Sequence, residues 1–269
     1  MPTASEFLIT KEYRRFEEFC NACRRDRYIG LCYGPPGVGK TLSARQYACW
    51  DVMEPYLAAW SHAERVRQGP YGQLAACRTV LYTPTVTTTA RSLEREVTGL
   101  VMEMDCVVTH ALAAQAAPDS EWERDHCTLL IVDEADRLKM QGLEQLRDFY
   151  DRGTIGLVLI GMPGLEKRLA RYPQLYSRVG FAHAFRPLSQ EEMHFILQHH
   201  WAALGRELEP TQFTDQEAVA ASIRITAGNF RLLNRLVAQI RRITQLNGMQ
   251  TITREVVEAA RECLVIGTT

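Results

Sequence analysis

Short apolar runs alternate with amphipathic stretches along the first part of the chain. Five runs of β-prone residues, each bounded by polar residues, glycine or proline, predict buried strands. The predicted strands cover residues 28–33, 79–83, 128–132, 156–161 and 181–185. Helical spacing of apolar residues predicts helices over residues 7–25, 40–50, 92–104, 142–150 and 164–176, the last broken at Pro173. Alternation of strands and helices predicts a parallel sheet with right-handed crossovers.

After Pro187 the pattern becomes helical only. Ser189 and Glu192 have the spacing of a helix capping box, and Thr214 with Glu217 repeats that spacing. Further helices are predicted over residues 229–246 and 253–264. We therefore expect an α/β domain over residues 1–187 and a small all-helical lid domain over residues 188–269. Residues 54–77 have no pattern that we can assign, and residues 113–125 predict a loop.

Composition narrows the class of protein. The chain has 269 residues, 46% hydrophobic and 23% charged, and a net charge of −1. Any contact with nucleic acid must therefore come from a local patch rather than from the bulk charge. No apolar run approaches the length of a membrane span, and the N-terminus has no signal-peptide pattern. We expect a cytoplasmic protein without membrane association.

The cysteines and histidines favour structural roles. The eight cysteines are scattered, and several, such as Cys32 and Cys127, lie in or beside apolar strands, which is typical of reduced, buried thiols. Cys20 and Cys23 form one CxxC pair without a second pair, so two small apolar positions of a helix are favoured over a zinc site. The His199-His200 pair is typical of a helix surface.

The motif Gly-Pro-Pro-Gly-Val-Gly-Lys-Thr at residues 34–41 joins the first predicted strand to the next helix. It is a complete phosphate loop, in which glycines let backbone N–H groups face the phosphates and the helix N-terminus adds its positive end. We expect Lys40 to reach the β- and γ-phosphates of ATP and Thr41 to ligate Mg²⁺. The predicted nucleotide-binding residues are Gly34, Pro35, Pro36, Gly37, Val38, Gly39, Lys40, Thr41, Leu42 and Asp133.

The strand at residues 128–132 ends in two carboxylates. Ligands of open α/β sheets bind at the carboxyl ends of strands, so Asp133 is placed to hold Mg²⁺ together with Thr41. Glu134 is the candidate base that activates the attacking water. Asp136 is interpreted as a helix cap or ion-pair partner rather than a catalyst. The Asp-Glu-Ala-Asp sequence also spells a helicase box, but no second nucleotide-binding pattern follows it, so we reject that class.

A phosphate-loop domain followed by a helical lid resembles the AAA+ ATPases. Ser177-Arg178-Val179 precedes the last predicted strand, where clamp loaders and initiators carry an arginine finger, and Gly228-Asn-Phe-Arg231 is similar to their sensor-2 motif. The resemblance implies that Arg178 acts in trans and Arg231 in cis on the γ-phosphate, as catalytic residues beside Lys40 and Glu134. One departure is Met162-Pro163, where these enzymes place a polar sensor-1 residue, and it implies slow turnover.

A narrower similarity runs through residues 131–138, 157–169 and Arg178, which resemble transposition regulators of the TnsC, TniB and MuB type. That resemblance implies ATP-dependent assembly on double-stranded DNA, as a ring or a helical filament of about six subunits per turn. It also implies recruitment of a transposase, a target-selector protein as a further partner, and a place on the bacterial nucleoid.

In those relatives the segment after the second strand lines the DNA channel, which here is residues 83–91. Thr88, Thr89 and Arg91 are the candidate DNA-binding residues, because hydroxyls and a guanidinium can hydrogen-bond phosphates without reading sequence. A β-prone loop ending in a helix cap explains the same residues equally well.

Two other classes of function stay open. One is an AAA+ motor or loader in replication initiation or secretion, although no DNA-reading module such as a winged helix and no membrane segment is visible in the sequence. The other is a nucleotide-switched protein-binding module that does not hydrolyse ATP. Glu134 and Arg178 argue against the switch, and Met162 argues for it.

Overall fold

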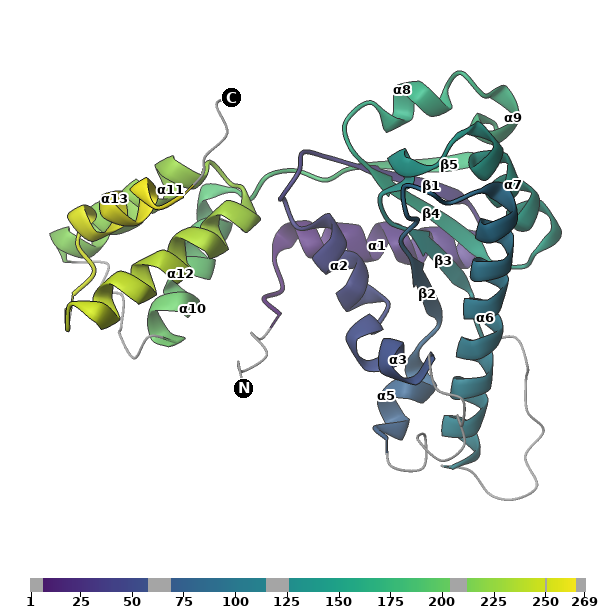
Figure 1. The fold of residues 1–269 in the computed structure, drawn as a ribbon, viewed down its shortest axis with the longest axis horizontal. Helices are drawn as coiled ribbons and strands as arrows, with labels where there is room; N and C mark the ends of the chain where they lie inside the picture. The colour runs from purple at the N-terminus through teal and green to yellow at the C-terminus, as the bar shows by residue number, and fades with distance from the viewer. Residues whose placement is uncertain (1–6, 58–68, 115–125, 204–211, 250, 265–269) are drawn as a thin grey trace. The chain divides into compact units, whose positions relative to one another are not determined.

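The computed structural model describes residues 7–57, 69–114, 126–203, 212–249 and 251–264 (Figure 1). The chain folds as two units. The sheet unit comprises Tyr13–Gly34 and Lys40–Phe185, and the helical unit comprises Met1–Glu12, Pro35–Gly39 and Arg186–Thr269. The middle of the phosphate loop thus groups with the helical unit, although both of its ends join residues of the sheet unit.

The sheet unit is built on five parallel strands in the order β2-β3-β4-β1-β5. The strands are β1 (Ile29–Tyr33), β2 (Thr79–Tyr82), β3 (Leu129–Val132), β4 (Gly156–Gly161) and β5 (Val179–Ala184). Strands β2, β3 and β4 are buried throughout, as their apolar sequences predict for strands of a parallel sheet. β5 lies at one end of the sheet and is largely exposed. The predicted α/β fold with a parallel sheet and C-terminal helices is confirmed.

Helices connect and flank these strands (Figure 1). They are α1 (Lys11–Asp26), α2 (Lys40–Tyr47), α3 (Trp50–Leu57), α5 (Tyr71–Ala76), α6 (Ala90–Ala113), the 3₁₀ helix η1 (Ala135–Arg137), α7 (Met140–Arg152), α8 (Leu165–Leu169) and α9 (Pro173–Tyr176). Cys20 and Cys23 are buried in α1, and burial raises the pKa of both thiols.

Several predicted boundaries were wrong. The helix expected over residues 40–50 ends at Tyr47, because Cys49 takes a left-handed backbone with φ of 49° before α3 begins. Helix α6 is longer than residues 92–104, since buried positions continue through Met104, Val107 and Ala111. The unassigned stretch 54–77 contains the end of α3 and all of α5, and its residues 58–68 lie outside the described part. Most of the predicted loop at residues 113–125 lies outside it as well.

The helical unit packs four C-terminal helices around its own apolar core. They are α10 (Gln190–Ala203), α11 (Phe213–Thr226), α12 (Phe230–Leu246) and α13 (Arg254–Glu262). Trp201, Leu236 and Ile240 are among the buried side chains of this core. The capping box before α10 is confirmed, since Ser189 and Glu192 exchange hydrogen bonds of 2.9 and 3.2 Å. The box expected at Thr214 does not form, because α11 already begins at Phe213.

The described residues contain no helix with the length and apolar character needed to cross a membrane.

Candidate nucleotide-binding site

The phosphate loop leaves the carboxyl end of β1 through positions that need glycine. A Cβ atom on Gly34 would lie 2.2 Å from the carbonyl oxygen of Phe185, so a side chain cannot fit there. Gly37 and Gly39 have φ of 79° and 111°, a backbone region that other residues rarely adopt. The helix that follows, α2, begins at Lys40. The local geometry is therefore that of a loop whose N–H groups lead into a helix N-terminus, as phosphate binding requires.

Lys40 and Thr41 are the first two residues of α2, and the side chain of each donates a hydrogen bond near the phosphate loop. The Lys40 ammonium donates to the carbonyl oxygen of Gly34 at 2.6 Å, which holds it over the loop. The Thr41 hydroxyl donates to Oδ2 of Asp133 at 2.6 Å, across 92 positions of sequence. The fold thus brings together the two residues that the sequence predicts as magnesium ligands.

Asp133 lies directly after β3 and is almost completely buried. Its N–H donates to the carbonyl oxygen of Tyr82 at 2.8 Å, and its Oδ1 accepts the Glu134 N–H at 2.9 Å. Burial raises the pKa of the Asp133 carboxyl, while the hydrogen bonds from Thr41 and Glu134 oppose that rise. A buried carboxylate beside a hydroxyl is an all-oxygen donor pair of the kind that suits Mg²⁺.

Glu134 has a left-handed backbone, with φ of 51° and ψ of 41°, which is uncommon outside glycine and concentrates at functional sites. Its carboxylate forms an ion pair with Arg137. The Arg137 guanidinium also donates to the carbonyl oxygen of Pro84 at 3.0 Å. Arg137 therefore links the candidate base to the segment that follows β2.

Asp136 has a structural role that differs from both roles expected for it. Its Oδ2 accepts the N–H of Met162 at 2.7 Å, just after β4. A Cβ atom on Gly161 would lie 2.4 Å from the same oxygen, so glycine makes room for this contact. Arg168 donates to the carbonyl oxygen of Asp136 at 3.0 Å and also to that of Leu138. The end of β4, where the sequence has no polar sensor-1 residue, is thus tied to the loop that carries Glu134.

Within the helical unit, the start of α12 contacts the middle of the phosphate loop. Asn229 caps α12 by accepting the Leu232 N–H, and its side-chain amide donates to the carbonyl oxygen of Pro36 at 3.1 Å. The Arg231 N–H donates to the carbonyl oxygen of Gly37 at 2.9 Å. Arg231 is exposed, and the structure shows no ion pair for it with any described residue. The start of α12 is thus joined to the middle of the phosphate loop by two hydrogen bonds.

Arg178 lies at the start of strand β1, whereas the phosphate loop follows the end of that strand. Its carbonyl oxygen accepts the N–H of Ile29 at the start of β1, whereas the loop begins after Tyr33 at the end of that strand. At about 3.3 Å per residue, a strand of this length separates the two points by roughly 15 Å. The guanidinium binds Oδ1 of Asp151 at 2.5 Å and also donates to the carbonyl oxygen of Gln174.

The candidate DNA segment forms a compact turn before α6. The Thr88 hydroxyl accepts the Thr85 N–H at 2.9 Å. Thr89 caps α6 and exchanges hydrogen bonds of 3.1 and 3.0 Å with Ser92. The helix-cap explanation of Thr89 is therefore realised in the structure. Arg91 is exposed and forms no ion pair with the described residues, which leaves its charge available to a ligand.

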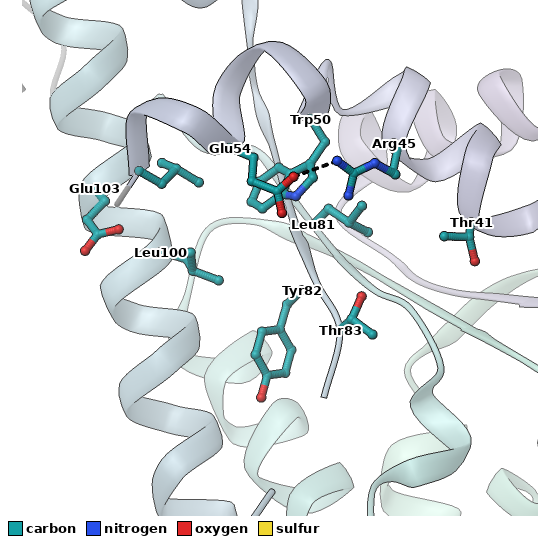
Figure 2. A pocket seen from close by; sticks show the side chains of 10 residues that line it. Thr41, Arg45, Trp50, Glu54, Leu81, Tyr82, Thr83, Leu100 and Glu103 are labelled. Carbon is teal, nitrogen blue, oxygen red and sulfur yellow. Dashed lines mark hydrogen bonds and ion pairs between the residues drawn. The ribbon is translucent and has the colours of Figure 1, made fainter. Parts of the chain in front are cut away.

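A cavity of about 410 Å³ borders both the nucleotide site and this segment. Figure 2 shows Thr41 at one end and Glu103 at the other, with Thr83 and the ion pair of Arg45 with Glu54 between them. Thr41 and Thr83 thus face one continuous space. No sequence pattern predicts this cavity, because its walls come from α2, α3, β2 and α6.

Comparisons with known proteins agree with this geometry. Residues 23–169 match the AAA domain family. The chain is 45% identical over 273 aligned residues to a potential ATP-binding protein of Staphylococcus aureus, covering 99% of both chains. It is 34% identical over 119 residues to the Mu-like prophage FluMu DNA transposition protein B of Haemophilus influenzae, which covers 41% of this chain and 38% of that protein.

Solved structures share the fold at low sequence identity. The Thermotoga maritima RuvB Holliday junction branch migration motor gives a TM-score of 0.59 at 18% identity, covering 97% of this chain and 72% of that one. The Aeropyrum pernix ORC1 protein in complex with DNA also gives 0.59 at 18% identity, covering 97% and 67%. With the family match over more than half of its length, the chain belongs to the AAA domain family of ATP-binding proteins.

Proposed function

We propose that this protein is an AAA+ ATPase that binds double-stranded DNA when it holds ATP, assembles on that DNA, and recruits or activates a transposase. The observation that carries the nucleotide chemistry is the contact of Thr41 with Asp133 beside a complete phosphate loop. The similarity to a Mu-like DNA transposition protein supports the biological setting.

The residues at the end of β3 and at the start of α2 have separate roles in ATP hydrolysis. Lys40 neutralises charge on the β- and γ-phosphates, while Thr41 and Asp133 would hold Mg²⁺, which supplies further charge neutralisation when bound. Glu134 accepts a proton from the attacking water. Arg231 supports the γ-phosphate from the same chain.

Arg178 acts from a neighbouring subunit. The separation between the start of β5 and the end of β1 places it too far from its own phosphate loop for a single arginine side chain to reach. A positive charge supplied in trans makes hydrolysis depend on assembly, because a monomer lacks it at its own site.

DNA contact is assigned to residues 83–91 together with the N-terminus of α6. Exposed hydroxyls, Arg91 and a helix N-terminus bind phosphates rather than base edges, so binding should be weakly selective for sequence. Arg137, in η1, binds both Pro84 of this segment and Glu134, so a DNA-induced movement of the segment would free the base. DNA would then stimulate ATP hydrolysis.

Filter binding on unrelated duplexes over a salt series tests the DNA assignment. Arg91→Ala should weaken binding with ATP and reduce its salt dependence, while nucleotide affinity stays unchanged. Arg91 is the better target than Thr89, since Thr89→Ala also removes the helix cap. Arg242→Ala, which changes an exposed arginine of α12, serves as the matched control. Equal binding by the Arg91 and Arg242 variants would overturn the assignment.

A nucleotide-switched binding module is the second candidate. The apolar Met162 at the end of β4 and the ion pair that engages Glu134 both favour it. Measurable ATP turnover that disappears in Glu134→Gln would exclude this candidate, whereas ATP binding without turnover under all conditions, with or without DNA, would support it.

A further inference from the structure

Cys49 and Cys77 bring two thiols together outside the nucleotide site. Cys49 lies between α2 and α3, and Cys77 follows α5, two positions before β2 begins. Helices α3 and α5 pack side by side (Figure 1), and the two cysteines meet where these helices join the rest of the sheet unit. Their thiols are hydrogen-bonded to each other. The Cys77 thiol has a further acceptor, the carbonyl oxygen of Gln73 at 3.3 Å, which fixes the position of its sulfur.

The two cysteines differ in exposure and in backbone geometry. Cys49 is exposed, whereas Cys77 is only 2% exposed. Cys49 has a left-handed backbone with φ of 49°, which is uncommon for residues other than glycine and concentrates at functional sites. Its carbonyl oxygen accepts the N–H groups of Val52 and Met53 at 3.1 and 3.0 Å, so Cys49 stands directly before the first turn of α3. An oxidant in solution therefore reaches Cys49 first, while Cys77 is covered.

The surroundings of Cys49 favour its thiolate. The hydrogen bond from Cys77 lowers the pKa of the Cys49 thiol to about 6, while desolvation opposes that shift. The same hydrogen bond, together with burial, raises the pKa of the Cys77 thiol, so the proton stays on Cys77. The N-terminus of a helix, here α3, also stabilises a thiolate. Burial instead raises the pKa of the Cys20, Cys23 and Cys127 thiols, which leaves those cysteines unreactive.

We propose that Cys49 and Cys77 form a peroxide-sensitive thiol pair, in which hydrogen peroxide oxidises Cys49 and Cys77 converts the product to a disulfide. In the first step the Cys49 sulfur attacks one oxygen of the peroxide, the O–O bond breaks, and the leaving hydroxide takes a proton from solvent. Cys49 is then a sulfenic acid. In the second step the Cys77 sulfur attacks the Cys49 sulfur, the S–O bond breaks, and the leaving hydroxide takes the Cys77 proton. The two sulfurs together lose two electrons, and the peroxide is reduced to two molecules of water.

The disulfide would join the start of α3 to the segment that leads into β2. Trp50 of α3 and Tyr82 of β2 both line the cavity that borders Thr41 (Figure 2). A covalent link between Cys49 and Cys77 would therefore restrain two walls of that cavity. The chemistry needs neither ATP nor DNA, so it goes beyond the proposed function and can be tested without it.

Peptide mapping by mass spectrometry, after treatment of the folded protein with hydrogen peroxide and alkylation without reduction, tests the proposal. The unchanged protein should yield two peptides joined through Cys49 and Cys77, which a dithiol reductant separates. Cys77→Ala should stop after the first step, so dimedone should trap sulfenic acid on Cys49 at least about tenfold more than in the unchanged protein. Cys49→Ser should leave Cys77 as a thiol. Cys106→Ser, at an exposed cysteine of α6, is the matched control and should form the disulfide like the unchanged protein.

Three results would overturn the proposal. If Cys49 remains a thiol, or is oxidised no faster than Cys106, it is not the reactive residue. If oxidised Cys49 becomes joined to a cysteine other than Cys77, the pairing is wrong. If dimedone traps Cys49 equally in the unchanged protein and in the Cys77 variant, Cys77 does not act in the second step. Because Cys77 is buried, the thermal unfolding temperature of each reduced variant is measured as well. If Cys77→Ala does not fold, the peptide map of the unchanged protein decides alone.

Discussion

Replacing Arg137 by alanine should raise the basal rate of ATP hydrolysis. Arg137 pairs with Oε2 of the Glu134 carboxylate, and that oxygen must leave the guanidinium before it can turn to the attacking water. The two side chains are 40% and 47% exposed, so water screens the pair. Exposed ion pairs contribute about 0.2 to 1 kcal/mol. If breaking the pair is part of the barrier, its removal accelerates hydrolysis by about 1.4-fold to about 5-fold, since 1.36 kcal/mol corresponds to tenfold.

The assay is steady-state phosphate release at saturating ATP and Mg²⁺, at one subunit concentration, with and without duplex DNA. Arg152→Ala is the control, because Arg152 forms comparable exposed ion pairs with Asp148 on α7 and Glu94 on α6, and neither partner belongs to the phosphate loop, to residues 133–137 or to residues 83–91. The Arg137 variant should show a higher basal rate and a smaller stimulation by DNA, and the Arg152 variant should show neither change. A basal rate that falls well below that of the Arg152 variant would refute the reasoning, since Arg137 would then orient Glu134 for catalysis instead of restraining it.

Three other perturbations test the remaining parts of the site. Glu134→Gln should nearly abolish ATP hydrolysis and keep ATP binding, whereas Lys40→Ala should lose ATP binding itself. If the Glu134 variant hydrolysed ATP at the rate of the unchanged protein, Glu134 would not be the base. Mixing Arg178→Ala with Lys40→Ala protein should restore part of the activity at mixed interfaces, and no recovery would count against action in trans. Burial raises the pKa of Asp133, so its carboxylate is protonated at a higher pH than that of an exposed aspartate. As the pH falls, Mg²⁺ should therefore stop strengthening nucleotide binding at a higher pH than it would with an exposed aspartate at this position. Titration calorimetry at several pH values should show this loss, and Asp133→Asn should remove the pH dependence.

The parts of the site that sequence predicted are those whose chemistry is encoded locally. A phosphate loop needs its glycines, lysine and threonine at fixed spacing between a strand and a helix, so residues 34–41 specify their own structure. Asp133 and Glu134 follow a short apolar strand. In a parallel sheet the carboxyl ends of the strands lie on the same side, so that strand ends beside the phosphate loop. The contact between Thr41 and Asp133 is therefore a consequence of fold class and motif together.

The contacts that sequence did not predict join residues without a local signal. The pairing of Glu134 with Arg137 has helical i,i+3 spacing and was open to prediction, but the link from Arg137 to Pro84 spans 53 positions. The pair of Arg178 with Asp151 likewise depends on how α7 and α9 pack. The break of the predicted helix at Cys49 depends on a left-handed backbone, which the apolar spacing of residues 40–50 does not reveal.

Electron microscopy of the protein with ATP and Mg²⁺, with and without long duplex DNA, tests the proposed function most directly. We expect rings or helical filaments on the DNA, formed with ATP on duplexes of unrelated sequence and lost when ADP replaces ATP. Single particles that remain unattached to DNA at saturating ATP and low salt would contradict assembly on DNA and would favour the nucleotide-switched binding module.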